Sequence, residues 1–82
     1  MTLTVRPGRA RAGRFMRFRF RVHSPVSSCR SGASVRFRGT TVRADATGTA
    51  AVGKRLRRPG RYMARVTAPS CRSASVVVTV SN

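Results

Sequence analysis

The stretch RFMRFRFRV, residues 14–22, alternates apolar and basic side chains. Its apolar members share one parity and its arginines share the other, with Met16, Phe18, Phe20 and Val22 set against Arg17, Arg19 and Arg21. Successive side chains of a β-strand point to opposite faces of a sheet, so this period of two predicts a strand with one buried face and one arginine-bearing face. The stretch is therefore expected to form one wall of a hydrophobic core.

The same alternation recurs along the chain, and no window has the spacing of an amphipathic helix. The predicted strands cover residues 2–6, 14–23, 33–38, 40–44, 49–57, 61–68 and 73–81. Turn formers separate them, including a type I turn that begins at Asp45 and ends at Gly48, and the pair Pro59-Gly60. This spacing predicts an all-β, seven-stranded antiparallel sandwich with Greek-key connections and no helix of note. Residues 1–82 are expected to form this single domain.

Lys54 interrupts the regular pattern, because it falls on the same parity as Ala50, Val52 and Leu56. Two explanations are consistent with this. Either a bulge near Gly53 shifts the alternation, or the strand lies at a sheet edge where the lysine extends its ammonium group into solvent.

The composition is strongly basic, with 18 Lys and Arg residues against a single acid and a formal net charge of +17 in 82 residues. Asp45 is the only acid, so a glycosidase, which needs two carboxylates, is excluded, and a calcium or magnesium site is disfavoured. A nucleophilic triad would need a cysteine together with His23 and Asp45. However, His23 continues the arginine-bearing face of its strand, and Asp45 is expected to cap its own turn. The sequence therefore predicts a protein that is not an enzyme and uses no cofactor or metal ion.

Cys29 and Cys71 occupy matching Ser-Cys-Arg-Ser settings in loop-like stretches. A zinc site needs about four ligands, and only His23 could join the two cysteines. An even pair of cysteines in a small domain is typical of a structural disulfide and of an oxidising compartment, whereas the alternative is a pair of free thiols in a cytoplasmic protein. We expect the disulfide, with a Cα–Cα distance of about 4.4–6.8 Å.

Three segments follow one another in a recurring order: ASVRFRG at residues 33–39, then Asp45-x-x-Gly48-x-Ala50, then Leu56-x-x-Pro59-Gly60-x-Tyr62. This order resembles the bacterial immunoglobulin-like repeats of secreted and surface proteins, and it is similar to the carboxypeptidase-regulatory-like modules. Ala44 departs from the pattern, which usually has Thr before the aspartate, and the chain has no Trp. The resemblance implies an immunoglobulin-like domain that acts as a spacer, adhesive or accessory unit of a larger protein. A bond between the two cysteines would join two loops at one end of such a sandwich.

Tyr62 begins the sixth predicted strand and shares the parity of Ala64 and Val66. We expect its ring to pack inward and its hydroxyl to bind nearby backbone, as in a tyrosine corner. The alternative is an exposed aromatic residue that stacks on a ligand.

The arginines are the remaining functional signal, because each guanidinium can bind a phosphate, sulfate or carboxylate in a bidentate manner. The predicted polyanion-binding residues are Arg17, Arg19, Arg21, Arg36, Arg38, Arg61 and Arg65. Arg36 and Arg38 lie in the third predicted strand, and Arg61 and Arg65 lie in the sixth. These four are expected on the outer face of the sheet that does not contain the 14–23 strand. A simpler explanation is a high-GC genome, in which arginine is used wherever an outward polar residue is needed.

Two functions are consistent with these observations. The first is a non-catalytic extracellular or cell-surface module whose partners are neighbouring domains or anionic surface polymers. The second is a nucleic-acid-binding protein that uses the same arginines on phosphates, although no helix-turn-helix, zinc-finger or RNP signature is present. Met1 leads directly into a predicted strand and not into a signal peptide, and no apolar run approaches the roughly 18 residues that would span a membrane. The sequence predicts no particular oligomeric state.

Overall fold

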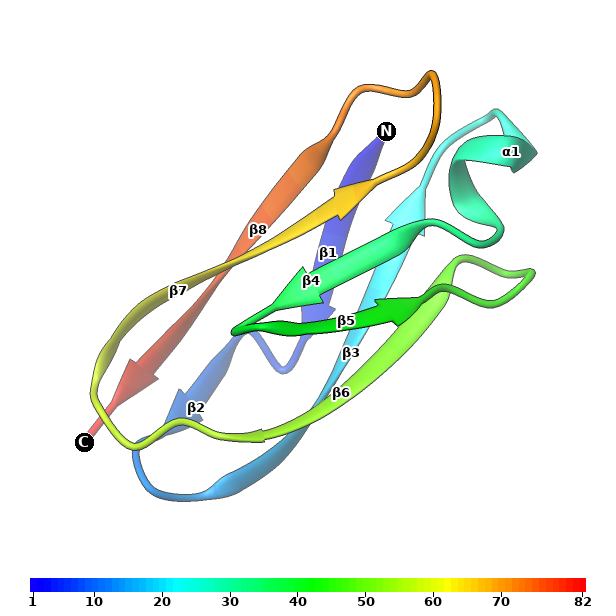
Figure 1. Cartoon of the computed structure of the whole chain (residues 1–82). Coiled ribbons are helices and arrows are strands. Elements are labelled where there is room, and N and C mark those ends of the chain that lie inside the picture. Colours follow the sequence, from blue (N-terminus) through cyan, green and yellow to red (C-terminus); the bar gives the residue numbers. More distant parts are fainter.

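The computed structural model describes all 82 residues as eight strands and one short helix in two facing sheets (Figure 1). The elements are β1 (Thr2–Arg6), β2 (Arg9–Arg11), β3 (Phe15–His23), α1 (Ser27–Arg30), β4 (Ser34–Phe37), β5 (Thr40–Arg43), β6 (Thr49–Arg55), β7 (Gly60–Thr67) and β8 (Ala74–Ser81). One sheet has the strand order β1-β3-β6, and the other has the order β2-β8-β7-β4-β5. The all-β class predicted from the alternation is confirmed.

β3 lies in the middle of the three-stranded sheet, antiparallel to β1 and β6. Phe18, Phe20 and Val22 are at most 1% exposed, while the arginines between them are exposed. The alternation of residues 14–22 therefore has the orientation that the sequence predicts.

The core forms where the two sheets meet. Phe37 of β4 reaches across from the five-stranded sheet, and its ring centroid lies 5.3 Å from those of both Phe18 and Phe20. Ala64 and Val66 of β7 are fully buried in the same cluster. Burial of each large apolar side chain contributes about 1.5–3 kcal/mol, so this cluster is the main source of stability in a chain of this size.

The prediction of seven antiparallel strands is wrong in two respects. β2 is an additional strand, and it pairs in parallel with β8. Its three residues place only Ala10 in the core, so the strand is too short to show a period of two in the sequence. The chain leaves β1 at Pro7, after a cis Arg6–Pro7 bond, and crosses from one sheet to the other.

The position of Lys54 is explained by the edge of the sheet. β6 is an edge strand, and its pairing with β3 continues without interruption from Thr49 to Arg55, so no bulge occurs at Gly53. Lys54 is only half-buried at this edge. The edge position offered as the second explanation is confirmed.

The two ends of the elongated sandwich carry different features (Figure 1). One end holds α1, the β5–β6 turn with Asp45 and the β7–β8 connection. The other end holds the β2–β3 and β6–β7 connections, and the turn between β4 and β5 lies part-way along the sandwich (Figure 1). The helix is four residues long, and no helix in the structure could cross a membrane.

Candidate anion-binding surfaces

The outer side of the three-stranded sheet, here called the β3 face, carries Arg6, Arg17, Arg19 and Arg21. All four are exposed. Arg6 of β1 lies directly opposite Arg19 of β3 in the strand pairing. β6 is the other neighbour of β3 in this sheet. In the strand pairing, Arg17, Arg19 and Arg21 lie opposite the small β6 residues Gly53, Ala51 and Thr49, respectively. Ala51 and Thr49 are small neighbours beside Arg19 and Arg21, whereas the Phe15 ring covers Gly53 beside Arg17.

Two hollows lie side by side on the β3 face, because both include Arg6 and Arg19. The first has a volume of about 570 Å³ and is lined by Thr4, Val5, Arg6, Arg19, Arg21 and His23. The second, of about 550 Å³, is lined by Arg6, Pro7, Arg17 and Arg19. Nε2 of His23 lies 3.0 Å from the Thr4 hydroxyl oxygen, so the histidine is part of this surface.

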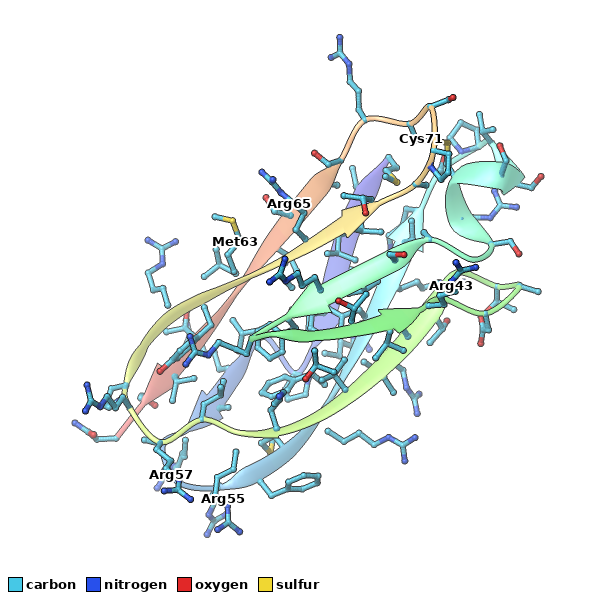
Figure 2. All side chains as sticks on the ribbon, viewed as in Figure 1. Arg43, Arg55, Arg57, Met63, Arg65 and Cys71 are labelled. Carbon is cyan, nitrogen blue, oxygen red and sulfur yellow. A yellow bond between two sulfur atoms is a disulfide. The ribbon has the colours of Figure 1, made fainter.

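The outer side of the five-stranded sheet, here called the β7 face, carries Arg36, Arg61 and Arg65, as the sequence predicts. Arg36 of β4 and Arg65 of β7 lie directly opposite each other in the strand pairing, and both are exposed. Met63, which is 61% exposed, lies between the two β7 arginines. Figure 2 shows Met63 and Arg65 pointing away from the sheet.

Arg38 was predicted to lie on the same face as Arg36, and this placement is wrong. Arg38 follows the end of β4 and has a φ of 50°, which takes it out of the strand alternation. Its guanidinium carbon lies 4.9 Å from the centroid of the Tyr62 ring, in a cation–π contact. The turn at Arg38 and Gly39 thus directs this arginine toward Tyr62 and the β6–β7 connection.

Tyr62 is half-buried against the core at the start of β7. Its hydroxyl donates a hydrogen bond of 2.6 Å to the carbonyl oxygen of Arg58. This bond spans Pro59 and Gly60, so it fastens the turn that precedes β7. It is the bond expected of a corner tyrosine.

Asp45 is occupied by its own turn. Its Oδ1 accepts hydrogen bonds from the Thr47 hydroxyl at 2.6 Å, the Thr47 N–H at 2.9 Å and the Thr49 N–H at 3.0 Å. These bonds, led by the one from the Thr47 hydroxyl, lower the pKa of Asp45 below its ordinary value. Oδ1 of the only side-chain carboxylate in the chain is therefore committed to a turn.

Gly48 closes the same turn and has a φ of 85°. A Cβ atom at this position would come within 2.9 Å of the Val22 carbonyl oxygen. The backbone of the turn packs so closely against β3 that only glycine fits there.

Cys29 of α1 and Cys71 of the β7–β8 connection form a disulfide with a Cα–Cα distance of 6.0 Å. No free cysteine remains. The bond ties the loop before β4 to the loop before β8, at the end of the sandwich where Asp45 lies (Figure 1). No group of three or more His, Cys, Asp or Glu residues is placed to hold a metal ion.

The sequence-based selection missed several cations that the structure exposes. Arg6 was omitted although it extends the β3 face. The run KRLRR at residues 54–58 was also omitted, although four cations in five positions are a readable signal. Phe15, which is 63% exposed, places its ring over Gly53, and there it covers the glycine backbone.

In comparisons with known proteins, no family model, no curated protein and no solved structure matches this chain. The resemblance to immunoglobulin-like repeats therefore depends only on the sequence segments that carry it.

Proposed function

We propose that this chain is a non-catalytic, immunoglobulin-like module of an extracellular or cell-surface protein, and that its two arginine-bearing faces bind anionic polymers. The observation that carries the proposal is the pairing of like charges across the strands. Arg6 faces Arg19 on one sheet, and Arg36 faces Arg65 on the other. Like charges directly opposite each other destabilise a sheet. An anion bound between them removes that repulsion and gains two charge-assisted contacts.

The charge of the whole chain acts in the same direction. A net charge of +17 on 82 residues produces a strong positive field that attracts polyanions and repels copies of the chain. Sixteen of the 17 arginines are exposed, and the only carboxylate side chain is held in its own turn. Nothing nearby on either face neutralises the guanidinium groups.

The strand order supports the immunoglobulin-like part of the proposal. The first strand is split between the sheets as β1 and β2, and β3 and β6 pair as strands B and E do in that fold. β4, β7 and β8 lie together on the second sheet, as strands C, F and G do. Tyr62 lies at the start of β7, which is where a tyrosine corner lies in strand F.

The disulfide supports an extracellular location, because such bonds persist in oxidising compartments. It differs from the bond between strands B and F of antibody domains, since it joins two loops at one end. A disulfide between two loops is consistent with a small extracellular domain that lies beside other domains of the same protein.

Nucleic acid is the second candidate ligand, and the row Arg17, Arg19 and Arg21 favours it. Side chains on one face of a strand are about 7 Å apart, close to the phosphate repeat of a single strand. No element of the fold is suited to enter a groove and read bases. We therefore expect nucleic acid to bind through its charge alone.

A pair of matched variants tests the proposal. Arg36→Ser/Arg65→Ser removes a cross-strand pair, while Arg14→Ser/Arg72→Ser removes two exposed arginines from outside both faces. Titration with a sulfated polysaccharide should show about a fivefold or greater loss of affinity for the first variant and less than about twofold for the second. Equal losses would mean that only net charge matters. Preference for one DNA sequence over its scrambled form by more than about tenfold would favour a dedicated nucleic-acid protein.

A further inference from the structure

We propose that the end of the sandwich opposite the disulfide contains a separate binding site for a compact, multiply charged anion. The site is a hollow of about 330 Å³, here called the basic hollow, lined by Arg38, Lys54, Arg55, Leu56, Arg57, Arg58 and Tyr62. Its ligand is a small group of closely spaced tetrahedral oxyanions, such as an oligophosphate or a cluster of sulfate esters. The inference does not depend on polymer binding by the two faces. Of its lining residues, only Arg55 lies on the outer side of the three-stranded sheet, at the end of β6 opposite Phe15.

Charge is the first reason for this assignment. Five of the seven lining residues are cations, and none is acidic. Asp45 cannot neutralise them, since it lies at the other end of the sandwich (Figure 1). In Figure 2, Arg55 and Arg57 lie close together at one end, with Arg43 and Cys71 toward the other. A linear triphosphate, with about four negative charges near neutral pH, would nearly balance the cations of the hollow.

The backbone that carries these cations is fixed. The side chain of Leu56 is buried, and its carbonyl oxygen accepts a hydrogen bond of 2.8 Å from the N–H of Gly13. Two residues later, the carbonyl oxygen of Arg58 accepts the bond from the Tyr62 hydroxyl. The connection is thus anchored on both sides of Arg57 while its arginine side chains remain exposed. A rigid backbone reduces the entropy lost when those side chains close on a ligand.

Arg38 brings a cation from a different part of the chain. The Tyr62 ring holds its guanidinium at 4.9 Å. A cation–π contact uses no N–H donor in a hydrogen bond, so the donors of Arg38 can bind oxygen atoms. One tyrosine therefore orients both walls of the basic hollow, the β4–β5 turn through its ring and the β6–β7 connection through its hydroxyl.

The size of the basic hollow limits the ligand. Sites for small molecules measure about 300–1,000 Å³, and this one is at the lower end of that range. It accommodates a few closely spaced oxyanions, whereas a sugar or base that carries them would extend into solvent. A compact ion is therefore the appropriate probe, whereas long polymers are the probe for the β3 and β7 faces.

Calorimetric titration of the disulfide-bonded chain with inorganic tripolyphosphate, and separately with a trisulfated disaccharide, tests this site. We expect one ion to bind per chain, and the tighter of the two probes identifies the source of the oxyanions. Arg55→Ser/Arg57→Ser/Arg58→Ser should weaken this binding by about tenfold or more. Arg17→Ser/Arg19→Ser/Arg21→Ser has the same net charge and should weaken it by less than about twofold.

Equal losses in the two triple variants, or no binding of either probe, would overturn the site. The affinity of the same variants for a long sulfated polysaccharide is measured in parallel. That measurement tests polymer binding by the β3 and β7 faces separately from binding of the compact ion in the basic hollow. If the first triple variant does not fold, Arg57→Glu and its matched control Arg19→Glu replace the pair. Amide chemical shifts of the unmodified chain give an independent readout, because tripolyphosphate should move signals at Arg38 and residues 54–62. Movement spread over β3 would contradict the assignment.

Discussion

Tyr62 packs against the core, and its hydroxyl binds the backbone of Arg58 in the wall of the basic hollow. Tyr62→Phe keeps the ring and its contact with Arg38 but removes the hydrogen bond to the Arg58 carbonyl. We expect a loss of about 1 kcal/mol, because that carbonyl lies near the surface and can bind water instead. Chemical denaturation at constant pH measures the change. A difference smaller than about 0.3 kcal/mol would mean that the hydroxyl does not fasten the turn.

Asp45 gives a pH dependence whose direction follows from its hydrogen bonds. Folding lowers its pKa, so its contribution to stability is present above the unfolded pKa and is lost as the pH falls through the folded pKa. Between about pH 5 and pH 2 the melting temperature of the chain should therefore fall. Asp45→Asn keeps an oxygen acceptor for Thr47 and Thr49 but cannot titrate, and its melting temperature should fall less. Parallel curves for the two proteins would contradict this account.

Single residues also show where sequence reasoning succeeds and where it stops. Asp45 and Tyr62 are predictable because each binds backbone within four residues along the chain. The position of Arg38 is not predictable from alternation, because a positive φ after β4 takes it off the strand parity. Its contact with Tyr62 joins residues from two different strand ends, which no local pattern reveals.

At the scale of elements, removal of the cross-strand pair of Arg36 and Arg65 should raise the stability of the chain and lower its affinity for polyanions. Arg65→Gln removes a like-charge pair, whereas Arg61→Gln on the same strand faces Thr79 and removes none. Without ligand and at low salt, the first variant should be more stable than the second by about 0.2–1 kcal/mol. The difference should shrink as salt screens the charges.

Thermal unfolding of the two variants at low and high salt checks this prediction. The same Arg65→Gln variant should bind sulfated polysaccharide more weakly than the unmodified chain. If Arg65→Gln neither gained stability nor lost affinity, the two guanidinium groups would be too well hydrated to repel each other or to bind an anion together.

Element prediction follows the length of each alternation. β3 is readable because its alternation persists over the whole strand, so one parity is buried and the other exposed. β2 cannot be predicted from alternation, because Ala10 is its only buried residue. Its parallel pairing with β8 depends on a crossing at Pro7, where the turn formers indicate a break but not the sheet that follows. The KRLRR run is visible as charge, but the hollow that it lines exists only after β4 and β7 pack nearby.

At the scale of the whole molecule, the disulfide closes a loop with a sequence separation of 42. In a chain-entropy treatment, such a loop contributes about 4 kcal/mol, which is a large share of the stability of a small domain. Cys29→Ser/Cys71→Ser should lose stability of this order in denaturant unfolding. Alkylation of the native protein without reduction should leave its intact mass unchanged. Two alkylated cysteines would contradict the bond and weaken the case for an oxidising compartment.

The central claim is that the arginine faces bind polyanions by charge and not by sequence, and the salt dependence of affinity tests it most directly. Each neutralised phosphate of duplex DNA contributes about −0.9 to the slope of log K against log salt, so five to seven arginines should give about −4 to −6. Arg17→Ser/Arg19→Ser/Arg21→Ser should reduce the steepness by up to about 3 and leave the fold intact, because these side chains are exposed. The account predicts that steep slope and its reduction in the variant. A slope near zero, or one that the variant does not change, would contradict it.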